Sequence, residues 1–340
     1  MVCPGGFQSG ISLRICTAAM NDSEALTKEP LKKVEELLFA TLRGSAEEQS
    51  VNSLCQQVVK SGGKRVRPRL ALLSGMALSG GTCTGQILHF AAAVELLHTA
   101  TLIHDDVIDR ASVRRGAPTL NETDGNHVAV LAGDYMFTRC FVEFHALDSS
   151  DLYGAVNEAV SSLVAGEINQ LKLQGDLSVS REQYRETIFC KTGALFALTC
   201  SGPAILARRP QSEIRALHEY GRCLGEGFQI ADDMLDYSAD ENTLGKNAGE
   251  DLSDGRVTLP LIVALERTKV EDRAALEQAA HEGDLKNVLS WITKTGALDE
   301  CQRCADAAAQ QAKAALSFLP DSPCKQALLD LAVKASRRRR

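Results

Sequence analysis

The longest stretch of this chain without proline runs from Thr119 to Gly202. Proline interrupts helices because it lacks a backbone N–H and its ring clashes with the preceding turn, so long helices are permitted here. Within the stretch, residues 128–147 and 152–173 carry apolar side chains at the three- and four-residue spacing of an amphipathic helix. The stretch therefore predicts two long helices.

The same spacing occurs along most of the chain, and no convincing strand accompanies it. Hydrophobic residues make up 44% of the sequence but aromatic residues only 5%, and a core rich in Ala and Leu favours helix over sheet. No glycine- and serine-rich linker divides the chain. We therefore expect an all-α fold, with a disordered leader over residues 1–25 and one helical domain over residues 26–340. Further helices are expected at residues 86–110, 212–237, 30–43, 67–77, 181–201, 260–266 and 298–318.

Charge and cysteine content exclude several classes of protein. The net charge of −7 argues against a nucleic-acid-binding surface. The 11 cysteines show no disulfide framework, which indicates a reduced, cytoplasmic setting. The CxxC at Cys301–Cys304 has no second ligand pair for zinc and is interpreted as structural. No run of eighteen apolar residues occurs, so we expect at most peripheral membrane contact, through the arginine tail Arg337–Arg340.

Two acidic motifs of the form DDxxD lie near the ends of two predicted long helices. One is in LIHDDVID and the other in QIADDMLD, so the residues around them are also similar. Carboxylates at i and i+4 repel one another, and near a helix C-terminus they also oppose the helix dipole. Such clusters cost stability unless a cation offsets them. The repetition suggests that two helices present similar ends to one shared cavity.

Magnesium is the cation that these carboxylates suit. Mg²⁺ takes oxygen ligands, usually one or two carboxylates together with waters and substrate phosphates. The two motifs therefore predict a magnesium-dependent enzyme that acts on diphosphate esters. The predicted metal ligands are Asp105, Asp106, Asp109, Asp232, Asp233 and Asp236.

Basic residues that could bind a diphosphate accompany both motifs. The segment GGKRVRP, residues 62–68, joins a glycine turn to a dense basic run but lacks the GxxxxGK[ST] pattern of a P-loop. Arg114 and Arg115 follow the first acidic motif, and Lys246 and Arg256 follow the second. A basic loop is usually just solvated. A histidine on an apolar helix, such as His98, usually belongs to the core, so neither feature proves a binding site by itself.

Several motifs in order make the chain resemble the all-trans polyprenyl diphosphate synthases, from about Leu31 onward. They are GGKRVRP, AVELLHTATLIHDDVID, RRGAPT, LAGDYMF, GEINQL, KTGALF, GFQIADDMLDY and the segment LGK…DLSDGRVTLP. The resemblance implies a single helical bundle around a central apolar cavity. It also implies condensation of isopentenyl diphosphate with an allylic prenyl diphosphate, with about three Mg²⁺ ions per active site.

The resemblance also implies a role for individual residues. The contacts to isopentenyl diphosphate map to Lys64, Arg67, His98 and Arg115, and those to the allylic diphosphate map to Arg114, Lys191, Lys246 and Arg256. The family usually has lysine at position 256, and arginine keeps the charge with a different geometry. The residues that match those stabilising the allylic cation are Lys191, Thr192 and Gln229.

Product length is expected to depend on the residues just before the first acidic motif. Ala100 and Thr101 lie roughly 6–7.5 Å down the helix from Asp105. Short-chain members of the family place a bulky aromatic residue at one of these positions, whereas both residues here are small. We therefore expect a product of about C30–C50, of the kind attached to quinones, with Phe137 or Phe141 as the floor of the cavity. Small residues there could also simply allow tight helix packing.

Three alternatives stay open at the level of sequence. A short-chain synthase would make C15–C20 products. A class I terpene cyclase would normally carry an NSE-type second motif, which this chain lacks, and a non-catalytic regulatory subunit should have lost site residues that are present here. The family is typically homodimeric, although some long-chain members need a small dissimilar partner subunit.

Overall fold

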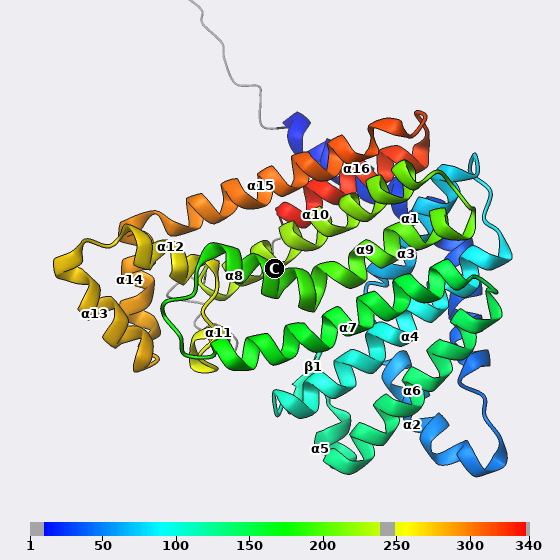
Figure 1. Ribbon diagram of the computed structural model, residues 1–340, viewed down its shortest axis with the longest axis horizontal. Helices are drawn as coiled ribbons and strands as arrows, with labels where there is room; N and C mark the ends of the chain where they lie inside the picture. The colour runs from blue at the N-terminus through cyan, green and yellow to red at the C-terminus, as the bar shows by residue number, and fades with distance from the viewer. Residues whose placement is uncertain (1–9, 239–248, 338–340) are drawn as a thin grey trace, which may run out of the picture. The chain divides into compact units, whose positions relative to one another are not determined.

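The computed structural model describes residues 10–238 and 249–337, which form helices grouped into two compact units (Figure 1). The first unit consists of Met1–Tyr153, Gly202–Arg209 and Leu319–Asp330, and the second of Gly154–Ser201, Pro210–Phe318 and Leu331–Arg340. The division falls within helices α7, α9 and α16, each of which contributes residues to both units.

The first unit is built around the pair α4 and α6. Helices α1 and α3 pack on α4, and α2 and α5 pack on α6. A two-residue antiparallel hairpin, with Val113 opposite Pro118, follows the end of α4. The elements of this unit are α1 (Gly10–Thr41), η1 (Ala46–Glu48), α2 (Gln49–Lys60), α3 (Val66–Leu78), α4 (Gly85–Ile108), β1 (Val113–Arg114), β2 (Ala117–Pro118), α5 (Leu120–Asp124) and α6 (Asn126–Ala146).

Helix α4 carries the first acidic motif, and its sequence explains where it begins and why it is buried. Thr84 caps its first turn, with the hydroxyl accepting a hydrogen bond from the backbone N–H of Ile87. Residues 90–97 are buried, as expected of a helix that is apolar around most of its circumference. Gly75 of α3 lets Ile87 approach closely, because a Cβ atom there would lie 2.5 Å from the Ile87 side chain.

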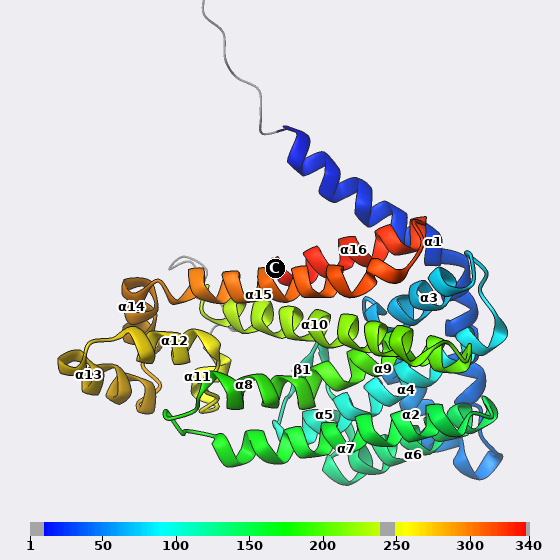
Figure 2. The ribbon, with the colours of Figure 1, turned by 45° about the horizontal axis from the view of Figure 1, so that its top comes forward.

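The second unit is built around α10, which runs alongside α15 in both views (Figure 1 and Figure 2). Helix α12 packs against α14 and α15, and the π-helical turn η2 packs against α10. The remaining helices are α7 (Ser150–Leu173), α8 (Arg181–Ile188), η2 (Phe189–Gly193), α9 (Ala194–Leu206), α10 (Gln211–Asp236), α11 (Glu250–Ser253), α12 (Leu259–Arg267), α13 (Val270–His281), α14 (Leu285–Thr295), α15 (Ala297–Ala315), η3 (Leu316–Phe318) and α16 (Pro323–Ser336).

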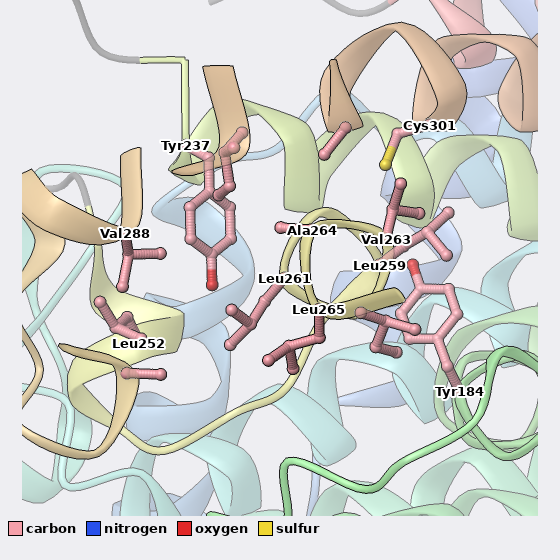
Figure 3. Close-up of a cluster of buried hydrophobic side chains, with 14 of the residues drawn as sticks. Tyr184, Tyr237, Leu252, Leu259, Leu261, Val263, Ala264, Leu265, Val288 and Cys301 are labelled. Carbon is pink, nitrogen blue, oxygen red and sulfur yellow. The ribbon is translucent and has the colours of Figure 1, made fainter. Parts of the chain in front are cut away.

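A buried apolar cluster in the second unit surrounds α12 (Figure 3). Leu261 and Val263 of this helix lie between two tyrosines, Tyr184 from α8 and Tyr237, which follows α10. Both tyrosines are almost completely buried. The cluster therefore fixes the end of α10, where the second acidic motif lies.

The π-helical turn interrupts what the sequence predicts as one helix over residues 181–201. Two glycines make room for it: a Cβ atom at Gly166 of α7 would lie 2.7 Å from the backbone nitrogen of Lys191, and one at Gly225 of α10 would lie 2.8 Å from the Cα of Gly193. Such turns insert an extra residue into a helix and are frequent at functional sites. Here the turn carries Lys191 and Thr192.

The predicted all-α class is confirmed, and the long predicted helices occur within a few residues of their expected bounds. The differences lie elsewhere. Helix α1 begins at Gly10, within the stretch that we expected to be a disordered leader, and residues 1–9 lie outside the described residues. The ranges predicted from the sequence did not include the helices α2, α5, α11, α13, α14 and α16. The extent of the domain, residues 26–340, stays a prediction.

Two helical runs are long and apolar enough to cross a membrane by length and composition alone. They are Gly85–Ile108 and Arg181–Leu206, and 67% and 72% of their most apolar windows are buried inside the protein. Core helices have the same composition, so burial accounts for these two runs.

Candidate active site

The first acidic motif lies at the end of α4, and its three carboxylates differ in their exposure to solvent. Asp105 is half-buried and Asp109 is exposed, whereas Asp106 is buried. The Nε atom of Arg114 donates a hydrogen bond to Oδ1 of Asp106 at 2.6 Å. Burial raises the pKa of Asp106, and the positive charge of Arg114 opposes that rise. The motif therefore leaves its two outer carboxylates more accessible than the middle one.

Arg67 and His98, both predicted to contact isopentenyl diphosphate, are joined by a hydrogen bond. The Nη1 atom of Arg67 lies 2.9 Å from Nε2 of His98, and since a guanidinium can only donate, this ring nitrogen accepts. Burial and the arginines around it, first of all Arg67, lower the pKa of His98 well below its usual value. Burial also lowers the pKa of Arg67 to about 10. His98 is therefore neutral near pH 7, with its proton on Nδ1.

The predicted basic segments come together over the glycine turn. Arg115 donates a hydrogen bond to the carbonyl oxygen of Gly62, and a Cβ atom at Gly63 would collide with its guanidinium. Arg65 is held by Glu95 at 2.8 Å and lines the same cavity of about 250 Å³ as Asp106 and Arg115. Arg65 and Arg115 both adopt positive φ angles, which are uncommon for residues with side chains and concentrate at functional loops. A concave, strongly basic site results.

The second acidic motif, at the end of α10, repeats the pattern of the first. Asp232 is exposed, Asp236 is half-buried and Asp233 is buried. The carboxylate of Asp236 accepts hydrogen bonds of 3.0–3.1 Å from the backbone N–H groups of residues 249–251. These bonds attach the segment that carries Arg256 to the end of α10.

The buried Asp233 lies within a chain of side-chain hydrogen bonds. Tyr184 Oη donates to its Oδ2 at 2.6 Å, and Gln229 Nε2 donates to its Oδ1 at 2.8 Å. Thr192 Oγ1 in turn donates to Gln229 Oε1 at 2.9 Å. Burial, and then the nearby carboxylate of Asp251, raise the pKa of Asp233 to about 8. The structure thus brings together Thr192 and Gln229, two of the three predicted catalytic residues.

Two of the predicted diphosphate-binding residues, Lys191 and Arg256, line the same cavity as these hydrogen-bonded side chains. The volume of the cavity is about 100 Å³. Lys191 makes an ion pair of 2.9 Å with Glu167 of α7. Arg256 lies 3.5 Å from Asp251 and 3.0 Å from Asp254. Burial and the charge of Asp236 raise the pKa of Asp251 to about 7. Cations and uncharged oxygen donors therefore surround one cavity in the second unit.

The donor chemistry of both motifs fits magnesium. Within residues 10–238 and 249–337, no group of three or more His, Cys, Asp or Glu side chains is placed to hold a metal ion by itself. Magnesium does not require such a cage, because waters and substrate phosphates usually complete its coordination. The outer carboxylates Asp105, Asp109, Asp232 and Asp236 would supply the oxygen ligands of the protein.

The residues assigned to product length lie on α4 in the first unit. Ala100 is fully buried, and Thr101 is half-buried with its hydroxyl donating to the carbonyl oxygen of His98 at 2.8 Å. The ring of Phe137, on α6, lies 5.6 Å from that of His104. Phe137 therefore lies beside the end of α4 close to Asp105, its role as the cavity floor stays a prediction, and the burial of Ala100 would also follow from tight packing.

Not every predicted contact is placed. Lys64 is exposed, and Lys246 lies outside the described residues. Tyr184, Glu167 and Asp251 belong to the site but were not selected from the sequence. The one signal for Tyr184 was its position seven residues before Lys191, which is two helical turns.

Comparison with known proteins identifies the family. The family model described as polyprenyl synthetase matches residues 48–292. The octaprenyl diphosphate synthase of Escherichia coli is 39% identical over 325 residues, which cover 91% of this chain and 99% of that protein. The chain belongs to the polyprenyl synthetase family. The resemblance seen in the sequence is thereby confirmed, and with it the assignment of the chain as a chain-elongating trans-prenyltransferase.

Solved structures of this family share the fold. A decaprenyl diphosphate synthase from Rhodobacter capsulatus superimposes with a TM-score of 0.88 at 32% identity, covering 94% of this chain and 98% of that one. A polyprenyl synthase from Caulobacter crescentus, complexed with calcium and isoprenyl diphosphate, gives 0.85 at 33% identity, covering 94% and 98%. A divalent cation and a prenyl diphosphate therefore accompany this fold in a related protein.

Proposed function

We propose that this polyprenyl synthetase uses Mg²⁺ to condense isopentenyl diphosphate with an allylic prenyl diphosphate, giving an all-trans product of about C30–C50 for quinone side chains. The observation that carries the reaction type is the cavity of the second unit. It combines Lys191 and Arg256, which suit a diphosphate, with the oxygens of Thr192 and Gln229, which suit a carbocation. No protein nucleophile is required, because the leaving diphosphate departs before the new bond forms.

Different groups would stabilise the negative and the positive charge that develop during the reaction. Magnesium, when bound by carboxylates of the acidic motifs, would neutralise the diphosphate that leaves, with about three ions per active site. Lys191 and Arg256 add fixed positive charge for the same leaving group, a preorganised effect that costs no rearrangement during the reaction. Thr192 and Gln229 line the cavity with oxygen atoms that can stabilise an allylic cation without attacking it.

The basic site of the first unit suits the diphosphate of isopentenyl diphosphate. Arg67 and Arg115 are planar guanidinium groups that can bind phosphate oxygens in pairs, and Lys64 offers a third charge. His98 is neutral and accepts from Arg67, so it orients this guanidinium rather than adding charge. Arg114 is held by Asp106 at the edge of the same cavity.

A single incubation tests the reaction type. The purified chain is mixed with labelled isopentenyl diphosphate, farnesyl diphosphate and Mg²⁺, and the dephosphorylated products are separated by chromatography. We expect prenyl alcohols longer than the primer, and no product when EDTA replaces Mg²⁺. A cyclic hydrocarbon would indicate a terpene cyclase, and the absence of any product would indicate a regulatory subunit or the need for a partner subunit.

Product length is tested by filling the space at Ala100. The Ala100→Phe variant should shorten the product to about C15–C20 while sparing the rate of the first condensations, because the metal ligands lie more than a turn away. Ala274→Phe, the same change at an exposed position of α13, serves as the control. A wild-type product of C15 or C20, or a variant with an unchanged product, would show that Ala100 serves helix packing.

We also propose that the chain forms a homodimer. Helix α6 exposes Val130, Leu131 and Val142, and α7 exposes Val164, Ile168 and Leu171. Apolar side chains repeated along exposed helix faces are typical of a surface that a partner covers. A small partner subunit is the alternative, and the mass of the purified chain in solution distinguishes the two. The cytoplasmic location expected from the sequence stays a prediction.

A further inference from the structure

The hydrogen bonds from Thr192 to Tyr184 have a defined direction. An amide nitrogen only donates and an amide oxygen only accepts, so Gln229 donates to one oxygen of Asp233, while the Tyr184 hydroxyl is hydrogen-bonded to the other. The amide of Gln229 is thereby oriented with its nitrogen toward Asp233 and its oxygen toward Thr192. Thr192 then donates its hydroxyl hydrogen to that oxygen. The hydroxyl oxygen of Thr192 consequently presents only lone pairs in its other directions.

This orientation is what a carbocation requires of its surroundings. A cation is stabilised by the negative ends of dipoles, and a hydroxyl hydrogen pointing at it would be repelled. All four side chains line the same cavity as Lys191. A reversed chain, with the Gln229 nitrogen toward Thr192, would release the threonine hydrogen toward the cavity.

We propose that Tyr184 is a positioning residue for prenyl transfer, which through Asp233 and Gln229 keeps the hydroxyl oxygen of Thr192 turned toward the reacting allylic group. The inference rests on the proposed roles of Thr192 and Gln229. Tyr184 itself does not touch the substrate in this account. It acts by occupying the second oxygen of Asp233, which leaves the first oxygen for Gln229.

Tyr184 is well placed for this role. Its side chain is 4% exposed and packs into the apolar cluster around α12 (Figure 3), so its hydroxyl cannot turn away to water. Burial, and then the charge of Asp233, raise the pKa of Tyr184 well above its usual value. The phenol therefore keeps its proton near neutral pH.

The first test compares two tyrosines of the same buried cluster. Tyr184→Phe removes the donor to Asp233 with little change in shape, and Tyr237→Phe removes a hydroxyl that takes no part in the chain. We expect Tyr184→Phe to lower kcat by about 10- to 100-fold with KM for both substrates changed less than about threefold, and Tyr237→Phe to change kcat less than about threefold. Equal effects of the two changes on kcat would overturn the proposal.

A double-mutant cycle shows whether Tyr184 and Thr192 act through one chain of hydrogen bonds or contribute independently to kcat. Thr192→Val removes the hydroxyl at the end of the hydrogen-bonded chain. If Tyr184 acts only through this hydroxyl, the double variant should have a kcat less than about twofold lower than that of Thr192→Val alone. If the two substitutions lower kcat independently, so that their fold-changes multiply in the double variant, the proposal is overturned. If Thr192→Val alone leaves kcat unchanged, the proposed role of Thr192 fails. If Thr192→Val lowers kcat and Tyr184→Phe does not, that role stands and the inference about Tyr184 fails.

A second pair of variants covers the case in which Tyr184→Phe does not fold. Replacement of Tyr184 by 4-aminophenylalanine or by 4-methylphenylalanine gives side chains of nearly equal size, of which the first donates and the second does not. We expect the amino variant to retain kcat within about threefold and the methyl variant to lose about 10-fold or more, with both giving normal circular dichroism spectra. Equal kcat values for these two variants would contradict the proposal.

Discussion

The middle aspartate of each acidic motif differs from its two neighbours. Asp106 and Asp233 are buried and accept hydrogen bonds from protein donors, Arg114 for the first and Tyr184 and Gln229 for the second. The first and third aspartates are more accessible and share a helix face at i and i+4. The outer pairs are therefore the better candidates for metal ligands, and the metal-binding role of all six aspartates stays a prediction.

Loss of an outer carboxylate should abolish most of the activity. Asp105→Asn or Asp232→Asn removes a charged ligand for magnesium, and we expect turnover to fall by about a thousandfold or more, equivalent to about 4 kcal/mol of transition-state stabilisation. The circular dichroism spectrum should be unchanged. Asp272→Asn, on α13, is the control and should keep normal turnover. Near-normal turnover of either site variant with magnesium would mean that the ligands are wrongly assigned.

The neutral state of His98 gives the protein a pH-dependent stability. Its pKa is lowered in the folded protein, so the unfolded chain binds the proton more readily, and this contribution is lost as pH falls below about 6.5. The slope for one such group approaches about 1.4 kcal/mol per pH unit. His98→Asn should therefore flatten the fall of Tm between pH 6.5 and pH 5. His127→Asn, an exposed histidine, is the control, and equal slopes for both variants would contradict the assignment.

At the scale of elements, the π-helical turn at Phe189–Gly193 depends on the glycines that face it. Gly166 lies directly against the backbone of Lys191, whereas Gly154, on the same helix α7, has open space around its Cα. The first glycine thus allows close approach of two backbones, and the second has no such requirement. The two positions form a matched pair.

Alanine at these two positions should have opposite effects. Gly166→Ala forces α7 and the turn apart, and we expect a loss of about 1–3 kcal/mol in the free energy of unfolding together with lower kcat, because Lys191 and Thr192 move. Gly154→Ala should stabilise by about 0.5–1 kcal/mol through helix propensity. Urea unfolding and steady-state kinetics measure both quantities. A Gly166→Ala enzyme with normal stability and kcat would show that the turn tolerates displacement.

At the scale of the whole molecule, each unit carries one acidic motif and its own set of cations. Arg67 and Arg115, the predicted contacts to isopentenyl diphosphate, lie in the first unit, and Lys191 and Arg256, predicted to contact the allylic diphosphate, lie in the second. Arg114 is the exception, because it was assigned to the allylic diphosphate but lies in the first unit. This division predicts separable effects on the two substrates. Lys64→Ala and Arg67→Ala should chiefly raise KM for isopentenyl diphosphate, and Arg256→Ala should chiefly raise KM for the allylic primer. Steady-state kinetics with each substrate varied in turn would measure both KM values. Equal effects of the three substitutions on both KM values would show that the assignment is wrong.

The oligomeric state also belongs to this scale. Leu131 on α6 is 65% exposed, and a charge there should weaken a homodimer formed through this helix. We expect Leu131→Glu to shift the protein toward monomer in sedimentation velocity at micromolar concentration. Val270→Glu, on α13, places the same charge at a residue that is 90% exposed and should leave the mass unchanged. A monomeric wild type would refute the proposed dimer.

The sequence by itself determined the all-α class, the long helices, the two acidic motifs and the family, because apolar periodicity and the order of short motifs are local properties of the chain. It also pointed to Thr192 and Gln229. Only the tertiary structure decided how these residues are held: the interruption of the helix at Lys191, the burial of Asp106 and Asp233, and the hydrogen bond from Tyr184. These depend on contacts between residues far apart in the chain, such as Tyr184 with Asp233, and no local pattern encodes which buried carboxylate will meet which donor.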